Sequence, residues 1–233
     1  MQKMRVLLAI ITDIILQNIT FCQDFGKIST HKSGDKTMSR LYFKYGTMGS
    51  SKSAQALMCK FNYEQKGMKV LLVKPELDNR GDDGETPKVR SRIGLVAECK
   101  TISAEQSFVD LFDQAVASGG CDCIIVDEAQ FCTPTQIDQL KQLTKHVPVL
   151  CYGLMTDFRC KLFKGSKRLV ELADSLQEIK SVCRCGRKST VNARYINGRC
   201  VDDGPIVFIG GDESYENLCY WCWQEELAKG KNK

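Results

Sequence analysis

Apolar and polar residues alternate in blocks along the chain, and the blocks predict strands and helices in turn. Continuous apolar or aromatic runs are typical of strands in a parallel sheet, and they occupy 41–45, 69–74, 123–126 and 147–153. Segments with helical spacing lie between and after these runs, at 53–66, from Ser103 to about Ala117, from Thr133 onward and at 165–174. This alternation predicts an α/β fold, in which a parallel sheet is flanked by helices.

Capping and turn residues set the expected limits of these elements. Ser103 with Gln106 has the spacing of a capping box, as does Thr133 with Gln136. Gly119 and Gly120 are expected to end the first of these two helices. Residues 75–89 are polar and rich in turn formers, so a mobile loop is expected there.

Three segments with different composition divide the chain. Residues 1–37 contain basic residues, a short apolar run and then a polar stretch, so we interpret them as an N-terminal extension that is disordered or not native. A secretory signal is the alternative interpretation. Residues 38–180 are expected to form the nucleotide-binding domain. From about 181 the chain is rich in Gly, Arg and Cys, which predicts a small second domain at 181–233.

Composition narrows the class of protein. The chain of 233 residues is 43% apolar and 26% charged, which is enough to bury a sizeable core. Its formal net charge of +5 suits a phosphorylated small ligand, and the basic residues form no strong stripe of the kind that nucleic-acid-binding proteins present. The cysteine count is 13, an odd number that favours reduced thiols and a cytoplasmic location.

The stretch "GTMGSSKS" at 46–53 is nearly a phosphate-binding loop of the pattern G-x-x-x-x-G-K-[ST]. Lys52 is placed to reach the β- and γ-phosphates of a nucleotide, and the Ser53 hydroxyl to reach Mg²⁺. Ser51 replaces a glycine that often takes a left-handed backbone conformation. A non-glycine residue there is expected to cost about 1 kcal/mol.

Two adjacent acids follow the apolar run at 123–126. Asp127 is at the position where folds of this kind hold Mg²⁺, and Glu128 is placed to accept a proton from a nucleophile. Solvated acids at a strand end are the alternative. Together with the upstream loop, the pair predicts a nucleotide site.

Four cysteines near the C-terminus form two close pairs. The pair Cys183 and Cys185 is separated by 33 residues from the pair Cys219 and Cys222, which favours a structural Zn²⁺ site with four thiolates. The first pair has one residue fewer than the usual C-x-x-C, which puts the geometry in question. Ordinary thiols are the alternative.

Taken together, these motifs resemble the thymidine kinases of the cytosolic, non-herpesviral and bacterial kind. The resemblance runs from about Met38 to about Trp223 and rests on the order of "LYFKYGTMGSSKS", "ELDNR", "SRIGL", "VDEAQF", "VLCYGLMTDF", "CRCGRK" and "GPIVFIGGDESY". It implies a P-loop NTPase (RecA-like) sheet with a small zinc-ribbon-like C-terminal domain. It also implies ATP-dependent phosphorylation of the 5′-hydroxyl of deoxythymidine.

The resemblance assigns roles by position. It implies that Glu128 is the general base. It places ATP and Mg²⁺ against Gly46, Thr47, Met48, Gly49, Ser50, Ser51, Lys52, Ser53, Asp78, Arg80, Asp127, Glu128, Ala129 and Gln130. It places the nucleoside against Met48, Phe131, Phe158, Asn192, Phe208, Ile209, Gly210 and Tyr215, and structural Zn²⁺ on Cys183, Cys185, Cys219 and Cys222.

Further expectations follow from the same resemblance: a homotetramer, feedback inhibition by thymidine triphosphate, and no nucleic-acid or membrane partner. Two alternatives remain open at the level of sequence. Ser51 points to a catalytically impaired nucleotide-binding regulator, and "DEAQ" after a phosphate loop is similar to helicase-type motors.

Overall fold

The structure is a computed structural model that describes residues 39–77, 86–204 and 215–231. The extension predicted at 1–37 lies outside these residues. So do five predicted site residues, namely Asp78, Arg80, Phe208, Ile209 and Gly210.

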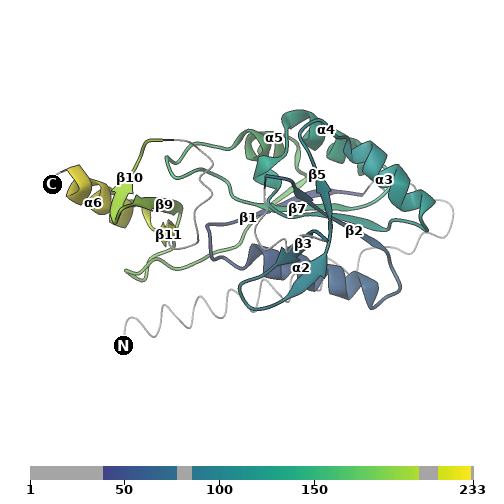
Figure 1. Cartoon of the computed structure of the whole chain (residues 1–233), viewed down its shortest axis with the longest axis horizontal. Helices are drawn as coiled ribbons and strands as arrows, with labels where there is room; N and C mark the ends of the chain where they lie inside the picture. The colour runs from purple at the N-terminus through teal and green to yellow at the C-terminus, as the bar shows by residue number, and fades with distance from the viewer. Residues whose placement is uncertain (1–38, 78–85, 205–214, 232–233) are drawn as a thin grey trace.

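A six-stranded parallel sheet forms the centre of the larger part of the chain (Figure 1). Its strand order is β5-β2-β6-β7-β1-β8. The strands are β1 (Leu41–Tyr45), β2 (Val70–Pro75), β5 (Lys100–Ile102), β6 (Cys123–Val126), β7 (Val149–Gly153) and β8 (Ser175–Glu178). β1 lies between β7 and β8, with Phe43 opposite Cys151 and Leu176. The predicted α/β fold with a parallel sheet is therefore confirmed, although β5 and β8 had no counterpart among the expected strands.

Helices cover both faces of this sheet. They are α2 (Lys52–Glu64), α3 (Phe108–Ala117), α4 (Pro134–Leu143) and α5 (Lys164–Leu172), with a short 3₁₀ turn, η1 (Ala129–Phe131), after β6. Figure 1 shows α3, α4 and α5 on one face and α2 on the other. The core is correspondingly divided into two layers, because side chains alternate along each strand. On β6, Ile124 and Val126 face α3 and α4, whereas Cys123 and Ile125 face α2.

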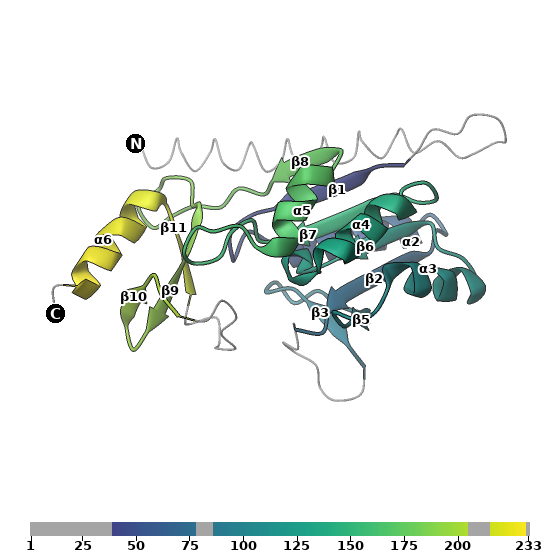
Figure 2. The ribbon, with the colours of Figure 1, turned by 90° about the horizontal axis from the view of Figure 1, so that it is seen from above.

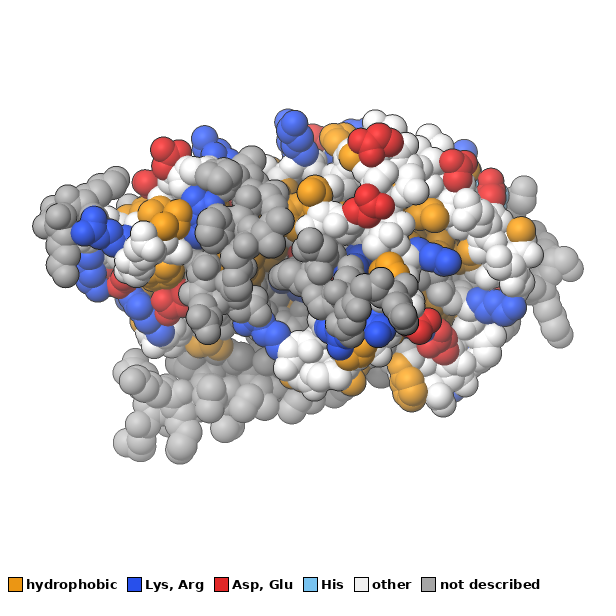
Figure 3. All heavy atoms as spheres, in the orientation of Figure 1, with side chains coloured by type: hydrophobic (Ala, Val, Ile, Leu, Met, Phe, Trp, Pro, Cys, Tyr) orange, Lys and Arg blue, Asp and Glu red, His pale blue; other side chains and the backbone are white. Residues whose placement is uncertain are grey.

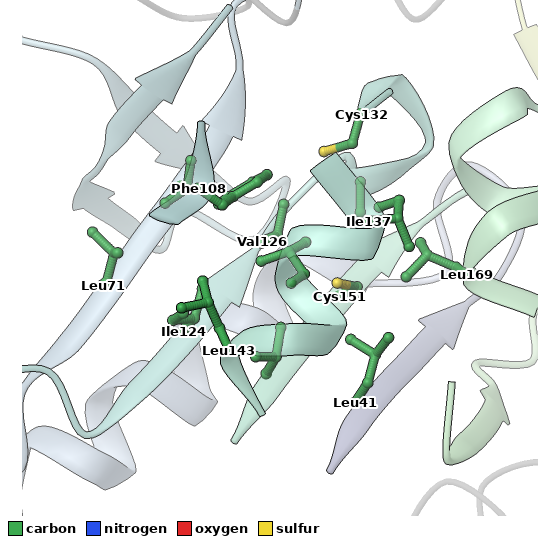
Figure 4. Close-up of a cluster of buried hydrophobic side chains, with 14 of the residues drawn as sticks. Leu41, Leu71, Phe108, Ile124, Val126, Cys132, Ile137, Leu143, Cys151 and Leu169 are labelled. Atoms are coloured by element: carbon green, nitrogen blue, oxygen red, sulfur yellow. The ribbon is translucent and has the colours of Figure 1, made fainter. Parts of the chain in front are cut away.

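The first of these layers is packed from large aliphatic and aromatic side chains (Figure 4). Ile124, Val126 and Cys151 from the sheet meet Ile137 and Leu169 from the helices, and all five are fully buried. Burying such side chains is the main favourable contribution to folding, and it fixes the strand ends that carry the site.

One predicted helix start is confirmed and one is wrong. Thr133 caps α4 with the full capping box: its hydroxyl accepts from Gln136 N–H, and the Gln136 side chain accepts from Thr133 N–H. By contrast, α3 starts at Phe108 with Ser107 as its cap. Ser103 with Gln106 forms a turn, because the Gln136 amide donates to the carbonyls of both residues.

The segment that was expected to be a loop ends in a hairpin. Strand β3 (Lys88–Arg90) pairs antiparallel with β4 (Val96–Glu98), so residues 88 and 89 belong to a strand and the loop prediction is wrong for them. Val89 is buried against α2 in the second core layer, and this contact explains why a mostly polar segment becomes ordered here.

A smaller unit lies at one end of the molecule (Figure 2). It consists of an antiparallel sheet, in the order β10-β9-β11, and a C-terminal helix; the elements are β9 (Val191–Ile196), β10 (Arg199–Val201), β11 (Tyr215–Leu218) and α6 (Tyr220–Lys231). Its own core includes Val191, Leu218 and Trp223. Where the domain boundary falls stays a prediction.

The surface of the described residues carries charges of both signs. On the face shown in Figure 3, acidic and basic side chains are interspersed. Within the described residues, none of the helices is both long and apolar enough to cross a membrane.

Candidate functional site

The loop at 46–53 connects β1 to the N-terminus of α2, where backbone N–H groups favour an anion. Gly46 has no room for a side chain, since a Cβ there would lie 2.4 Å from the Ile179 carbonyl oxygen. Gly49 has φ +75° and Ser51 has φ +65°, both in the left-handed region. The expectation that Ser51 takes the backbone conformation of the missing glycine is confirmed.

Lys52 is the first residue of α2 and is buried in the loop that precedes it. Its Nζ donates to the Thr47 carbonyl over 2.8 Å and to the Gly46 carbonyl over 3.2 Å. The ammonium group therefore sits inside the loop.

Asp127 follows β6 directly and is 3% exposed. The Ser53 side chain and the charge of Lys52 both act on its pKa, so the acid lies close to the phosphate loop. Burial raises the pKa of Asp127 to about 7 and the Glu128 carboxylate adds to the rise, while Ser53 and Lys52 oppose it. Asp127 Oδ1 is buried and has no hydrogen-bond partner among the described residues. A buried carboxylate oxygen beside a hydroxyl is a donor set that suits Mg²⁺.

Glu128 has φ +51° and ψ +37°, an unusual conformation for a residue other than glycine. Such strain persists only where the surrounding structure imposes it, and it is concentrated at functional sites. The conformation turns the chain sharply between β6 and η1, and it leaves the carboxylate only partly buried beside Asp127.

Gln130 fixes the position of the Glu128 carboxylate. Its Nε2 donates to Glu128 Oε2 over 2.5 Å, and its Oε1 accepts from Leu154 N–H over 3.0 Å. Gly153 allows this contact, because a Cβ at that position would lie 2.6 Å from Gln130 Oε1. The prediction assigned Gln130 to the ATP and Mg²⁺ side, and the structure places it between Glu128 and the end of β7.

Residues predicted to bind the nucleoside lie where the smaller unit meets the sheet. Phe158 is 2% exposed, and the Arg194 guanidinium lies 3.7 Å from its ring centroid. Asn192 Oδ1 accepts from Met48 N–H over 2.7 Å, and its Nδ2 donates to the Thr156 carbonyl over 3.3 Å. Asn192 thereby joins β9 to the phosphate loop.

The other two described nucleoside candidates are placed as follows. Phe131 packs edge-on against Phe163, with 5.7 Å between the ring centroids. Tyr215 begins β11 and pairs with Arg194 of β9. Neither observation by itself assigns a ligand to these residues.

Three hydroxyl groups form a second link between the phosphate loop and the smaller unit. Thr47 Oγ1 lies 2.5 Å from Ser181 Oγ and 3.0 Å from Ser189 Oγ, and the two serine oxygens are 2.5 Å apart. The sequence analysis did not identify this hydroxyl triangle. Its members are separated by 134 and 142 residues, and isolated Ser and Thr residues carry no recognisable signal.

The four cysteines of the smaller unit come together. The sulfur atoms of Cys183, Cys185, Cys219 and Cys222 all lie within 4.8 Å of one another. Cys183 accepts from Gly186 N–H in a tight turn, while Cys219 and Cys222 lie at the start of α6. Four sulfurs at this separation fit a tetrahedral Zn²⁺ ion, so the shortened first pair brings both of its sulfurs into the cluster.

Comparison with known proteins agrees with this geometry. The sequence matches the thymidine kinase family over residues 39–223. It is 40% identical to the thymidine kinase of Rhodopirellula baltica over 193 residues, which cover 82% of this chain and 90% of the relative. It is 40% identical to the thymidine kinase of Pasteurella multocida over 194 residues, which cover 82% of this chain and 100% of the relative. It is 42% identical to the thymidine kinase of Enterobacteria phage T4 over 195 residues, which cover 82% of this chain and 99% of the relative.

Proposed function

The chain belongs to the thymidine kinase family, and we propose that it transfers the γ-phosphoryl group of ATP to the 5′-hydroxyl of deoxythymidine, yielding dTMP and ADP. The observation that carries the residue-level proposal is the closeness of the buried Asp127 to Ser53 and Lys52 of the phosphate loop. It brings the two acids after β6 to the phosphate loop, so that a donor triphosphate and a proton acceptor share one site.

Lys52, Ser53 and Asp127 are the residues we assign to the triphosphate and its cation. Lys52 would exchange its loop carbonyls for phosphate oxygens, and Ser53 and Asp127 would hold Mg²⁺. When bound, Mg²⁺ would neutralise charge on the β- and γ-phosphates. The loop N–H groups and the α2 dipole add to the attraction.

We assign the general base to Glu128. The nucleoside 5′-oxygen forms a bond to the γ-phosphorus as the bond from that phosphorus to the β–γ bridging oxygen breaks. Glu128 accepts the hydroxyl proton, and ADP leaves. Because phosphoryl transfer depends mainly on positioning and charge stabilisation, a fixed base and a positive phosphate site are the main requirements.

We assign the nucleoside to the junction between the sheet and the smaller unit, against Met48, Phe131, Phe158, Asn192 and Tyr215. The support is that Asn192 of β9 hydrogen-bonds to the loops that follow β1 and β7, and that Phe158 of the second loop packs against Arg194 of β9. The base edge would be bound by residues 208–210 and the phosphates assisted by Asp78 and Arg80, all outside the described residues.

Two further assignments concern metal and assembly. We assign structural Zn²⁺ to the four-cysteine cluster, supported by the mutual proximity of its sulfur atoms. We also propose a homotetramer that is inhibited by thymidine triphosphate and acts in the cytoplasm. None of the described cysteines forms a disulfide, which fits a reducing compartment.

A kinase assay across the four deoxynucleosides tests the activity, using the chain from Met38 and the matched variant Glu128→Gln. We expect ATP-dependent formation of dTMP by the parent protein and a large loss of kcat in the variant. ATP binding without phosphorylation of any nucleoside would instead support the impaired regulator that Ser51 suggested. The family match over residues 39–223 favours the kinase over a helicase-type motor.

A further inference from the structure

The "SRIGL" segment at 91–95 forms the tip of the β3–β4 hairpin, and the roles assigned above leave it without a function. Its turn is held by several hydrogen bonds. Ser91 N–H donates to the Leu95 carbonyl over 2.8 Å, Leu95 N–H donates to Ser91 Oγ over 2.9 Å, and Gly94 N–H donates to the Ser91 carbonyl over 3.1 Å. Gly94 has φ +87°, which a glycine adopts without strain. The tip therefore has a defined conformation.

The base of the hairpin is fixed to the elements that carry the phosphate loop. Val89 is 3% exposed and packs with Ala56 and Leu57 of α2 in one core layer. Lys74 of β2, which is 1% exposed, donates to the Lys88 carbonyl over 3.1 Å. Since α2 begins at the phosphate loop, these contacts set the distance between the hairpin tip and that loop.

Arg92 extends from this tip to the phosphate loop. A Cβ built on Gly49 would lie 3.4 Å from a terminal guanidinium nitrogen of Arg92. Gly49 and Arg92 are both exposed, so the guanidinium approaches a part of the loop that solvent can reach. Lys52 approaches the loop from the buried side, through the Thr47 carbonyl. The loop is thus flanked by two cations that come from separate parts of the chain.

A nucleoside triphosphate carries several negative charges, and guanidinium groups bind phosphate oxygens through two parallel hydrogen bonds. We propose that Arg92 binds the triphosphate of the phosphoryl donor at this loop, together with Lys52. The inference rests on the proposed function only in that it needs a triphosphate at the loop. In this proposal the β3–β4 hairpin positions Arg92 next to the triphosphate of the donor.

Direct binding of a non-hydrolysable ATP analogue with Mg²⁺, measured by calorimetry, tests this without relying on catalysis. The variants are Arg92→Gln and Arg92→Lys, with Arg90→Gln as the matched control, because Arg90 is an exposed arginine on the same hairpin. We expect the dissociation constant to rise about 10-fold or more for Arg92→Gln, about the loss of one charge-assisted hydrogen bond, and less for Arg92→Lys. Arg90→Gln should stay within about twofold of the parent protein.

Steady-state kinetics supply the second measurement. In Arg92→Gln, kcat/KM for ATP should fall by a factor similar to the loss of binding, while the KM for thymidine at saturating ATP stays unchanged. An unchanged dissociation constant in Arg92→Gln, or equal losses in Arg92→Gln and Arg90→Gln, would overturn the inference. A parent protein that binds the analogue and phosphorylates no nucleoside would contradict the proposed function, and the binding comparison would still decide the role of Arg92.

Discussion

Gln130 and Glu128 are joined by a hydrogen bond of 2.5 Å from the amide Nε2 to the carboxylate Oε2. The amide cannot turn over, because Leu154 N–H is a donor and must face Gln130 Oε1. One buried glutamine therefore sets the direction of the acid that we assign as general base.

Gln130→Glu should reduce kcat by about 10- to 100-fold with little change in the KM for ATP. The new carboxylate would repel Glu128 and displace it, and displacement of about 1 Å can cost 100-fold in rate. Steady-state kinetics with Gln142→Glu, an exposed glutamine on α4, provide the control for the added charge. A kcat equal to that of the parent protein would mean that Glu128 needs no such positioning.

Ser51→Gly should stabilise the protein by about 1 kcal/mol, because glycine adopts φ +65° without the steric cost that serine incurs. The expected rise in Tm is about 2–4 °C, and turnover should rise as well. Ser51→Ala is the matched control, since alanine loses the hydroxyl yet keeps the backbone strain. Equal gains in both variants would trace the effect to the hydroxyl instead.

Cys185→Ser should lower the bound zinc from about one ion per chain, the expectation for a four-thiolate site, to a small fraction of that value. Elemental analysis of purified protein measures the metal directly, and a reduced Tm should accompany its loss. Cys160→Ser, an exposed cysteine outside the cluster, should retain the full zinc content. Full zinc content in Cys185→Ser would remove that residue from the ligand set.

Asp174 makes stability depend on pH. Desolvation acts to raise its pKa, but hydrogen bonds from Lys141 Nζ at 2.6 Å and Leu41 N–H at 2.8 Å dominate and lower it. A carboxylate whose pKa is depressed on folding contributes stability above its unfolded pKa, near 3.8, and loses that contribution as the pH falls through the folded value.

Asp174→Asn should therefore lower Tm at neutral pH, and the difference from the parent protein should shrink as the pH approaches 3. Thermal unfolding across this range measures the difference. Asp113→Asn, an exposed acid of α3, should show no such trend. A difference in Tm that is the same at every pH would contradict the assignment.

Deoxyuridine should be phosphorylated with kcat/KM lower than that of deoxythymidine by about 10- to 200-fold. The two nucleosides differ by one methyl group, and a single missing methyl in an apolar pocket is worth only about 1–3 kcal/mol. Parallel assays at matched ATP concentration give the ratio directly. Complete absence of deoxyuridine turnover would require a stronger means of selection than an apolar pocket provides.

The sequence alone predicted the structure correctly where a local pattern or a general rule of topology applied. Thr133 and Gln136 formed their capping box because both halves of that motif lie within four residues. Asp127 reached the phosphate loop because the carboxyl ends of parallel strands share one edge of the sheet. The paired spacing of the four cysteines favoured a common metal site, and their sulfur atoms do come together, although ordinary thiols were the alternative.

Prediction from the sequence failed where a contact with a residue distant in the chain determined the local structure. Gln136, 33 residues away, took the Ser103 carbonyl and turned a predicted helix start into a turn. The stacking of Arg194 on Phe158, and the clamp of Gln130 on Glu128, depend on how separate strands and loops meet in space. No spacing rule in the sequence predicts contacts of this kind.

The hydroxyl triangle has a mechanical consequence. Ser189 and Ser181 supply both of the neighbours that hold Thr47 Oγ1, and Ser189 lies only four residues after Cys185, on the connection from the sulfur cluster to β9. A shift of that connection would pull on the anchor of the nucleotide-binding loop, 142 positions earlier in the chain. A loss of order at the four-cysteine cluster would therefore first increase the mobility of the phosphate loop.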